Sequence, residues 1–169
     1  RMAIQLDERD ASLRADLAAV YQAQNQDHLA AQELQEALEL DRGNRDASLR
    51  LAQLLERHGN SAEAVRRLDQ ALQFHPQDLQ IHRQLGELHM RSGRLDDALS
   101  HFEEVVKLDP ASAELHHRLG RIYLKKRYDE QSVQAYRKAV ELHPVNPEFR
   151  EDLAMAYYCS GQLPDAIRE

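Results

Sequence analysis

Apolar and polar residues alternate along this chain with the spacing of short amphipathic helices. Between Leu79 and Ser112, two such runs are separated by a Gly-Arg break, and the second run ends in Leu-Asp-Pro. Within each run, large apolar residues recur three or four positions apart, which places them on one face of a helix. The pattern therefore predicts two short helices joined by a tight turn.

This two-helix pattern recurs along the chain at a fixed step of 34 residues, without an insertion. One column holds a large apolar residue at Leu17, Leu51, Leu85, Leu119 and Leu153. The next column holds only small residues, at Ala18, Ala52, Gly86, Gly120 and Ala154. Small residues let two helix axes approach closely, and a large neighbour fills the groove that results. The columns therefore predict helix pairs that pack against one another.

Glycine and proline mark the ends of the predicted helices. Gly59, Gly93 and Gly161 fall between the two helices of their units, where we expect a positive φ. Pro76, Pro110 and Pro144 follow the second helix, which they cannot continue. Some positions depart from the pattern: for example, Arg42 replaces the proline of the first unit, and Arg127 replaces the glycine of the fourth. We expect these departures to change local turns only.

The 34-residue columns resemble those of the tetratricopeptide repeat family, whose unit is a helix–turn–helix. The resemblance implies an all-α fold, a right-handed superhelical solenoid of antiparallel helix pairs. It implies a single array over 1–169, with full repeats at 11–44, 45–78, 79–112 and 113–146. Residues 1–10 would end a preceding repeat and 147–169 would begin another, so we expect the chain to be a piece of a longer array.

Composition and motifs exclude several classes of function. The net charge of −7 argues against general nucleic-acid binding, which depends on neutralising phosphates. No apolar run approaches the roughly 18–20 residues that span a membrane. The sequence has no glycine-rich phosphate loop, HExxH or Gly-x-Ser-x-Gly motif. We therefore expect no enzyme activity, catalytic residue, cofactor or metal. We interpret His82, His89 and His116 as packing residues, because they stand in columns of large side chains.

In the family that this chain resembles, the first helices of successive repeats line a concave groove that binds partners. Arginine is common at the corresponding positions, and its planar guanidinium suits carboxylates. The resemblance thus predicts a protein or peptide partner with an acidic segment or a C-terminal carboxylate. The alternative is a solvated face whose arginines pair internally with Glu87 and Glu114. The predicted groove residues are Arg50, Gln53, Arg57, Arg83, Gln84, Glu87, Arg91, His117, Arg118, Arg121 and Lys125.

The most direct hypothesis is a protein–protein interaction scaffold in a larger assembly. The excess of arginine over lysine suggests a bacterial source, and the context would then be envelope assembly, secretion or polysaccharide export. An alternative is self-association or a spacer role, because residues 11–44 carry two basic and six acidic residues whereas 113–146 carry seven and four. A third is a regulatory domain of an enzyme encoded elsewhere in the full chain. We expect a soluble protein, and either the cytoplasm or the periplasm fits.

Overall fold

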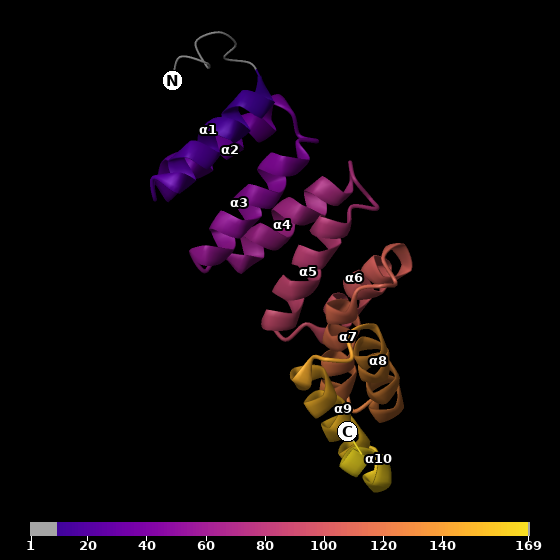
Figure 1. Ribbon diagram of the computed structural model, residues 1–169. Coiled ribbons are helices and arrows are strands. Elements are labelled where there is room, and N and C mark those ends of the chain that lie inside the picture. Colours follow the sequence, from indigo (N-terminus) through magenta and orange to yellow (C-terminus); the bar gives the residue numbers. More distant parts are fainter. Residues whose placement is uncertain (1–9, 169) are drawn as a thin grey trace. The chain divides into compact units, whose positions relative to one another are not determined.

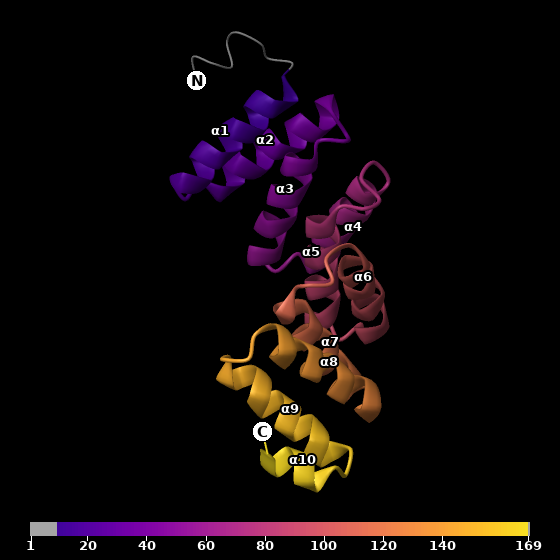
Figure 2. The ribbon, with the colours of Figure 1, turned by 45° about the vertical axis from the view of Figure 1, so that its right-hand side comes forward.

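The computed structural model describes residues 10–168, which form ten α-helices and no strand. The all-α prediction is therefore confirmed, and Figures 1 and 2 show the helices as successive pairs joined by short turns. The expected end of a preceding repeat at 1–10 falls, except for Asp10, outside the described residues. The helices are α1 (Ala11–Ala23), α2 (Asp27–Leu40), α3 (Arg45–Arg57), α4 (Ser61–Leu72), α5 (Leu79–Arg91), α6 (Leu95–Leu108), α7 (Ala113–Lys125), α8 (Asp129–Leu142), α9 (Pro147–Cys159) and α10 (Leu163–Arg168).

A column of polar residues precedes the first helix of every pair. Asp10, Asn44, Asp78, Ser112 and Asn146 stand 34 residues apart, one position before α1, α3, α5, α7 and α9. All of these side chains except that of Ser112 accept a hydrogen bond from a backbone N–H in the first turn that follows. Such a cap stabilises a helix by about 1 kcal/mol. The cap column therefore stabilises the start of every first helix except α7.

The turn between the two helices of each pair contains one residue with a positive φ. The φ angles are 77° at Gly59, 75° at Gly93 and 78° at Gly161, as the sequence predicts. In the first and fourth pairs the same conformation is taken by Asn25, with φ 57°, and by Arg127, with φ 61°. A residue with a Cβ is strained there, by about 1–2 kcal/mol in general. The backbone of the repeat thus keeps its turn even where glycine is missing.

Contacts divide the chain into two compact units, 1–81 (unit 1) and 82–169 (unit 2), and each is described here by itself. In unit 1, α1 packs against α2, and α3 packs against both α2 and α4. In unit 2, α7 packs against α6 and α8, and α9 packs against α8 and α10. The first turn of α5 belongs to unit 1 and the rest of that helix to unit 2.

The core of unit 1 is built from alanine and leucine. Leu34 and Leu51 are fully buried, and Leu54 is almost so. Small residues surround them and let the helices approach closely. These small residues are Ala15, Ala18, Ala30, Ala37 and Ala47. No aromatic side chain is among the buried residues of this cluster; Tyr21 packs at its edge.

The core of unit 2 uses aromatic residues against glycine. Phe102 and Tyr136 are the largest fully buried side chains there. A Cβ built at Gly120 would lie 2.8 Å from the Tyr136 ring, and one at Gly86 would lie 2.7 Å from the Phe102 ring. The two glycines are therefore required by the close approach of an aromatic face, and not by their φ angles.

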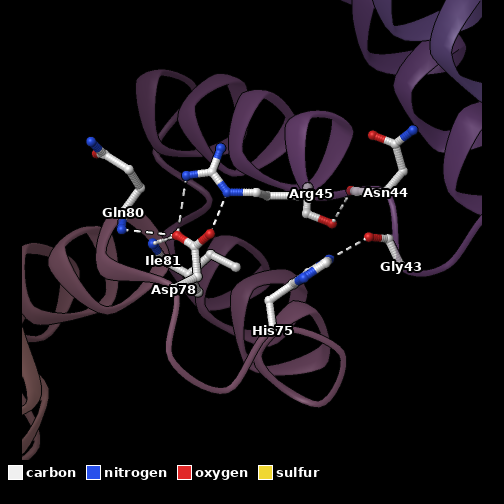
Figure 3. A network of polar contacts seen from close by, with 8 residues as sticks. Gly43, Asn44, Arg45, His75, Asp78, Gln80 and Ile81 are labelled. Atoms are coloured by element: carbon white, nitrogen blue, oxygen red, sulfur yellow. Dashed lines mark hydrogen bonds and ion pairs between the residues drawn. The ribbon is translucent and has the colours of Figure 1, made fainter. Parts of the chain in front are cut away.

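The turn between the two repeats of unit 1 is held by a polar network (Figure 3). Asp78 forms an ion pair with Arg45 and also accepts the amide N–H of Ile81 at 3.0 Å. Burial would raise the pKa of Asp78, but Arg45 and the helix amides lower it below its ordinary value. Nε2 of His75 lies 2.6 Å from the carbonyl oxygen of Gly43, to which it donates. Asp78 thus caps α5 and ties its start to the start of α3.

Candidate functional site

The predicted groove residues lie on three first helices. Arg50, Gln53 and Arg57 belong to α3 in unit 1, and all the others belong to α5 and α7 in unit 2. In unit 1, Arg50 pairs with Asp46 at 2.6 Å, one turn away on the same helix. Arg57 lies 3.7 Å from Asp27 of α2. Both arginines therefore already face a carboxylate, while Gln53 is exposed.

A carboxylate network crosses from α5 to α7 in unit 2. Nη1 of Arg118 lies 3.1 Å from a Glu87 oxygen, and its Nε lies 3.3 Å from Glu114. Arg91 is at 3.9 Å from the same Glu87 side chain. For Arg118, the structure thus contains the internal pairing that the sequence offered as the alternative to a peptide site. Surface pairs of this kind contribute about 0–1 kcal/mol each, so an incoming carboxylate can exchange with them.

Three further cations of unit 2 form no ion pair with any other residue in the described range 10–168. These are Arg83 on α5 and Arg121 and Lys125 on α7. The Nε atom of Arg83 is buried without a hydrogen-bond partner, as is Oε1 of the adjacent Gln84. Arg121 and Lys125 are exposed. Arg121 and Lys125 therefore present exposed donors to an anion, and Arg83 adds a buried Nε–H without a hydrogen-bond partner.

His117 does not lie on the open surface with the rest of the predicted set. It is buried, with 2% of its surface exposed. Its imidazole contacts the rings of Phe149, at 4.7 Å between centroids, and Tyr136, at 5.4 Å. Its Nε2 lies 2.7 Å from a carboxylate oxygen of Asp152 on α9. His117 is therefore shielded from a partner, and it instead joins α7 to α9.

Two of the three histidines that the sequence assigns to packing are buried. His82 and His89 contact His101 of α6, with ring centroids 5.2 and 5.4 Å away. Burial, together with the charges of His82 and His89, lowers the pKa of His101 to about 4. His116 is only half-buried, and its Nε2 lies 3.0 Å from the carbonyl of Pro110. No pattern in the sequence pointed to His101, which lies outside the repeated large-residue columns.

Unit 1 also has an open cleft that the sequence did not indicate. Its volume is about 680 Å³, and it lies mainly between α2 and α4. Phe74, in the turn after α4, is 52% exposed beside it. The lining residues are Gln35, Leu38, Glu39, Arg42, Ser48, Arg67, Gln70, Ala71, Gln73 and Phe74. Most of these residues belong to second helices or to the turns that follow them. The sequence prediction considered only first helices, so it did not include this cleft.

No helix within residues 10–168 combines the length and the apolar character needed to cross a membrane.

Paired helices with small-residue contacts, capped starts and positive-φ turns define a helical-repeat protein. Models of the tetratricopeptide repeat match residues 28–88, 83–147 and 135–168. The chain therefore belongs to the tetratricopeptide repeat family. A comparison with curated proteins finds no match.

Several solved structures resemble nearly the whole chain. YrrB, described as a tetratricopeptide repeat protein with an unusual peptide-binding site, is 17% identical with a TM-score of 0.87, over 99% of this chain and 86% of that one. A MamA structure is 16% identical with a TM-score of 0.86, over 94% and 86%. MamA from Desulfovibrio magneticus RS-1 is 21% identical with a TM-score of 0.84, over 94% and 89%. At these identities the likeness establishes the fold.

Proposed function

We propose that this chain is a non-enzymatic protein-interaction scaffold that binds an acidic or C-terminal peptide segment on the α5–α7 face of unit 2. Membership of a repeat family with a peptide-binding structural relative supports the general role. The observation that carries the specific site is the set of uncommitted donors at Arg83, Arg121 and Lys125.

The spacing of these residues supports one shared face across α5 and α7. Arg83 and Glu87 are one turn apart on α5, and Arg121 and Lys125 are one turn apart on α7. The 3.1 Å contact between Glu87 and Arg118 joins the two helices in the middle of this face. A peptide carboxylate that displaces Glu87 would find Arg118 already oriented. Carboxylates at either side would meet Arg83 or Arg121.

Guanidinium groups give this face its chemical preference. Charge-assisted hydrogen bonds to a carboxylate are about twice as strong as neutral ones, and arginine can make two at once. Binding at the surface must also offset desolvation and ordering of the peptide. We therefore expect modest affinity that falls as salt rises, since the exposed charges are screened over about 8–10 Å at physiological ionic strength.

A labelled peptide measures this proposal directly. The probe is a fluorescein-labelled peptide of alternating Asp and Glu with a free C-terminus, and the readout is fluorescence polarisation. We expect the double variant Arg83→Glu/Arg121→Glu to abolish binding. The matched control is Arg66→Glu/Arg94→Glu, which reverses two exposed arginines that lie outside α5 and α7. Equal affinity in both double variants would remove the site from the α5–α7 face.

Self-association is a second candidate, favoured by exposed apolar residues at the end of unit 2. On α9, Met155 is 53% and Tyr158 65% exposed, and on α10, Ile167 is 86% exposed. Contiguous exposed apolar patches mark surfaces that bind another chain, and we propose that these three side chains form such a patch. Light scattering over a concentration series measures the mass, and Met155→Ser/Tyr158→Ser is expected to shift a dimer to monomer. A mass that stays monomeric at every concentration excludes this role for the chain.

A bacterial assembly concerned with the envelope, secretion or polysaccharide export is the context that we propose for this scaffold. Its basis is the arginine-rich composition alone.

A further inference from the structure

Unit 2 brings together three side chains from α7 and α9 that the peptide face does not use. His117 lies on α7, and Glu148 and Asp152 lie one turn apart on α9. We propose that these three residues bind one divalent transition-metal ion, with Zn²⁺ as the best probe. The inference concerns a different surface from the α5–α7 peptide face and does not depend on the proposed function.

The donor atoms already lie close to one another. One imidazole nitrogen and one carboxylate oxygen from each acid fall within 4.8 Å of each other. Nε2 of His117 and Oδ2 of Asp152 are 2.7 Å apart. Ligands at about 2.0–2.2 Å from a tetrahedral zinc ion lie roughly 3.4 Å from one another. We expect a small rearrangement of the Glu148 or Asp152 side chain to bring the three donor atoms to this spacing.

The packing of unit 2 holds the His117 ligand in place and fixes the start of the helix that carries the two acids. The His117 ring is buried against Phe149 and Tyr136, so its ring nitrogen has little freedom of direction. The amide of Glu148 donates to the cap residue Asn146 at 3.0 Å, which fixes the start of α9. Ligands that are oriented before the ion arrives lose less entropy on binding.

The charge of the site also favours a cation. Two carboxylates and a neutral imidazole carry two negative charges, and Arg121 supplies the opposing positive charge nearby. Burial raises the pKa of the Tyr136 hydroxyl, Asp152 and Glu148 raise it further, and Arg121 opposes them. The same four side chains therefore share one electrostatic environment. Nε2 of His117 must be unprotonated when it ligates the ion.

The mixture of donors identifies the class of ion. Magnesium and calcium prefer oxygen ligands alone, whereas zinc accepts imidazole nitrogen and carboxylate oxygen together. The stability order of divalent ions also places zinc above manganese at a given site. Three protein ligands would leave a further coordination position open to water or to a partner's side chain.

Isothermal titration of the chain with zinc chloride at neutral pH tests the site. We expect one equivalent to bind, and Glu148→Gln and Asp152→Asn each to weaken binding by at least about tenfold, as loss even of an outer-shell partner does elsewhere. The matched control is Glu151→Gln, the same chemical change on an exposed residue of the same helix. Circular dichroism of each variant establishes that α9 is still folded.

The other histidines provide the decisive comparison. His101→Gln alters the separate cluster around His82 and His89 and should leave zinc affinity unchanged. Arg121→Gln removes the opposing charge and should strengthen binding severalfold. Zinc binding that survives both Glu148→Gln and Asp152→Asn, or that only His101→Gln removes, would overturn the proposal. Peptide binding measured in the presence of a chelator reports the α5–α7 face alone. The result of the zinc experiment therefore does not affect the test of the proposed function.

Discussion

Units 1 and 2 build the same repeat from different core residues. In every repeat, a small residue in the first helix is followed sixteen positions later by a buried large residue in the second. The pairs are Ala18–Leu34 and Ala52–Leu68 in unit 1, and Gly86–Phe102 and Gly120–Tyr136 in unit 2. In unit 2, glycine replaces the alanine of unit 1, and an aromatic residue replaces its leucine. The comparison teaches that the repeat preserves the volume of the pair and not the identity of either residue.

The units also differ in polar chemistry at equivalent positions. The histidine cluster of unit 2 corresponds, one repeat earlier, to Ser48, Leu55 and Arg67. Unit 1 instead has the Arg45–Asp78 pair, whose equivalents one repeat later are Leu79 and Ser112. The same backbone thus carries a pH-sensitive core in one unit and an ion-paired turn in the other.

The largest effect should come from breaking a glycine–aromatic pair. Gly120→Ala places a methyl group 2.8 Å from the Tyr136 ring, which is fully buried and cannot move away. Overpacking of this kind destabilises proteins by about 1–3 kcal/mol, and we expect the upper half of that range. Urea denaturation followed by circular dichroism measures the free energy of unfolding.

A double variant tests whether the effects of changing Gly120 and Tyr136 on stability are coupled. Gly120→Ala/Tyr136→Leu recreates the unit 1 pairing, and it should be more stable than the sum of the single changes predicts, by about 1 kcal/mol or more. The control in unit 1 is Ala52→Gly, which should cost only about 1 kcal/mol through helix propensity and a small void. Strict additivity of Gly120→Ala and Tyr136→Leu would contradict the idea of a preserved volume.

The histidine cluster should make the protein sensitive to mild acid. The pKa of His101 falls from an ordinary 6.5 to about 4 on folding, so between these values the unfolded chain binds the proton and the folded chain does not. Stability is therefore full above about pH 6.5 and is lost as the pH falls toward 4. Because the imidazole is partly exposed and Asp97 and Glu104 offset its neighbours, we expect a loss of about 1–2 kcal/mol.

The difference between two pH profiles isolates this contribution. The free energy of unfolding of the unchanged chain and of His101→Gln is measured from pH 7.5 down to about 4. The variant should lose less stability over this range, although carboxylates elsewhere titrate equally in both. Parallel profiles would show that His101 titrates alike in the folded and unfolded chain.

A smaller gain should follow from restoring a turn glycine. Arg127→Gly removes the Cβ from a residue with φ 61° and should stabilise the chain by about 1 kcal/mol. The converse change, Gly93→Ala, should cost a similar amount, because a Cβ there meets no atom within 4 Å and only the φ of 75° opposes it. Thermal melts of both variants give the two shifts, which should have opposite signs.

The smallest effect should come from the ion pair of unit 1. Arg45→Gln leaves the Asp78 cap on α5 intact and removes only the pairing, on a guanidinium that is 43% exposed. Exposed pairs contribute about 0.2–1 kcal/mol, so we expect a loss within that range that disappears in 1 M salt, where the screening length is about 3 Å. A loss that persists in high salt would point to packing of the arginine stem instead.

The sequence by itself determined the architecture. The 34-residue columns predicted helix pairs, and the family and the all-α fold are confirmed. The positive φ at Gly59, Gly93 and Gly161 was also predicted from the sequence, because a glycine between two amphipathic runs indicates a tight turn. The cap column at Asp10, Asn44 and its equivalents carries the same kind of signal. The turns and caps depend on residues within a few positions of one another, and the repeat depends on a fixed 34-residue spacing, so a single sequence contains both signals.

The tertiary structure alone decided which side chains are committed to one another. The sequence placed Arg83 and Arg118 on the same kind of face, yet Arg118 meets Glu87, 31 positions earlier, and Arg83 forms no ion pair within the described residues. The sequence also placed His117 in the groove, whereas in the structure it is buried within unit 2, beside Asp152 of α9. A repeat column fixes the direction of a side chain on its own helix. Its partner is fixed by how closely the next helix packs, and that distance depends on the volumes of many core residues at once.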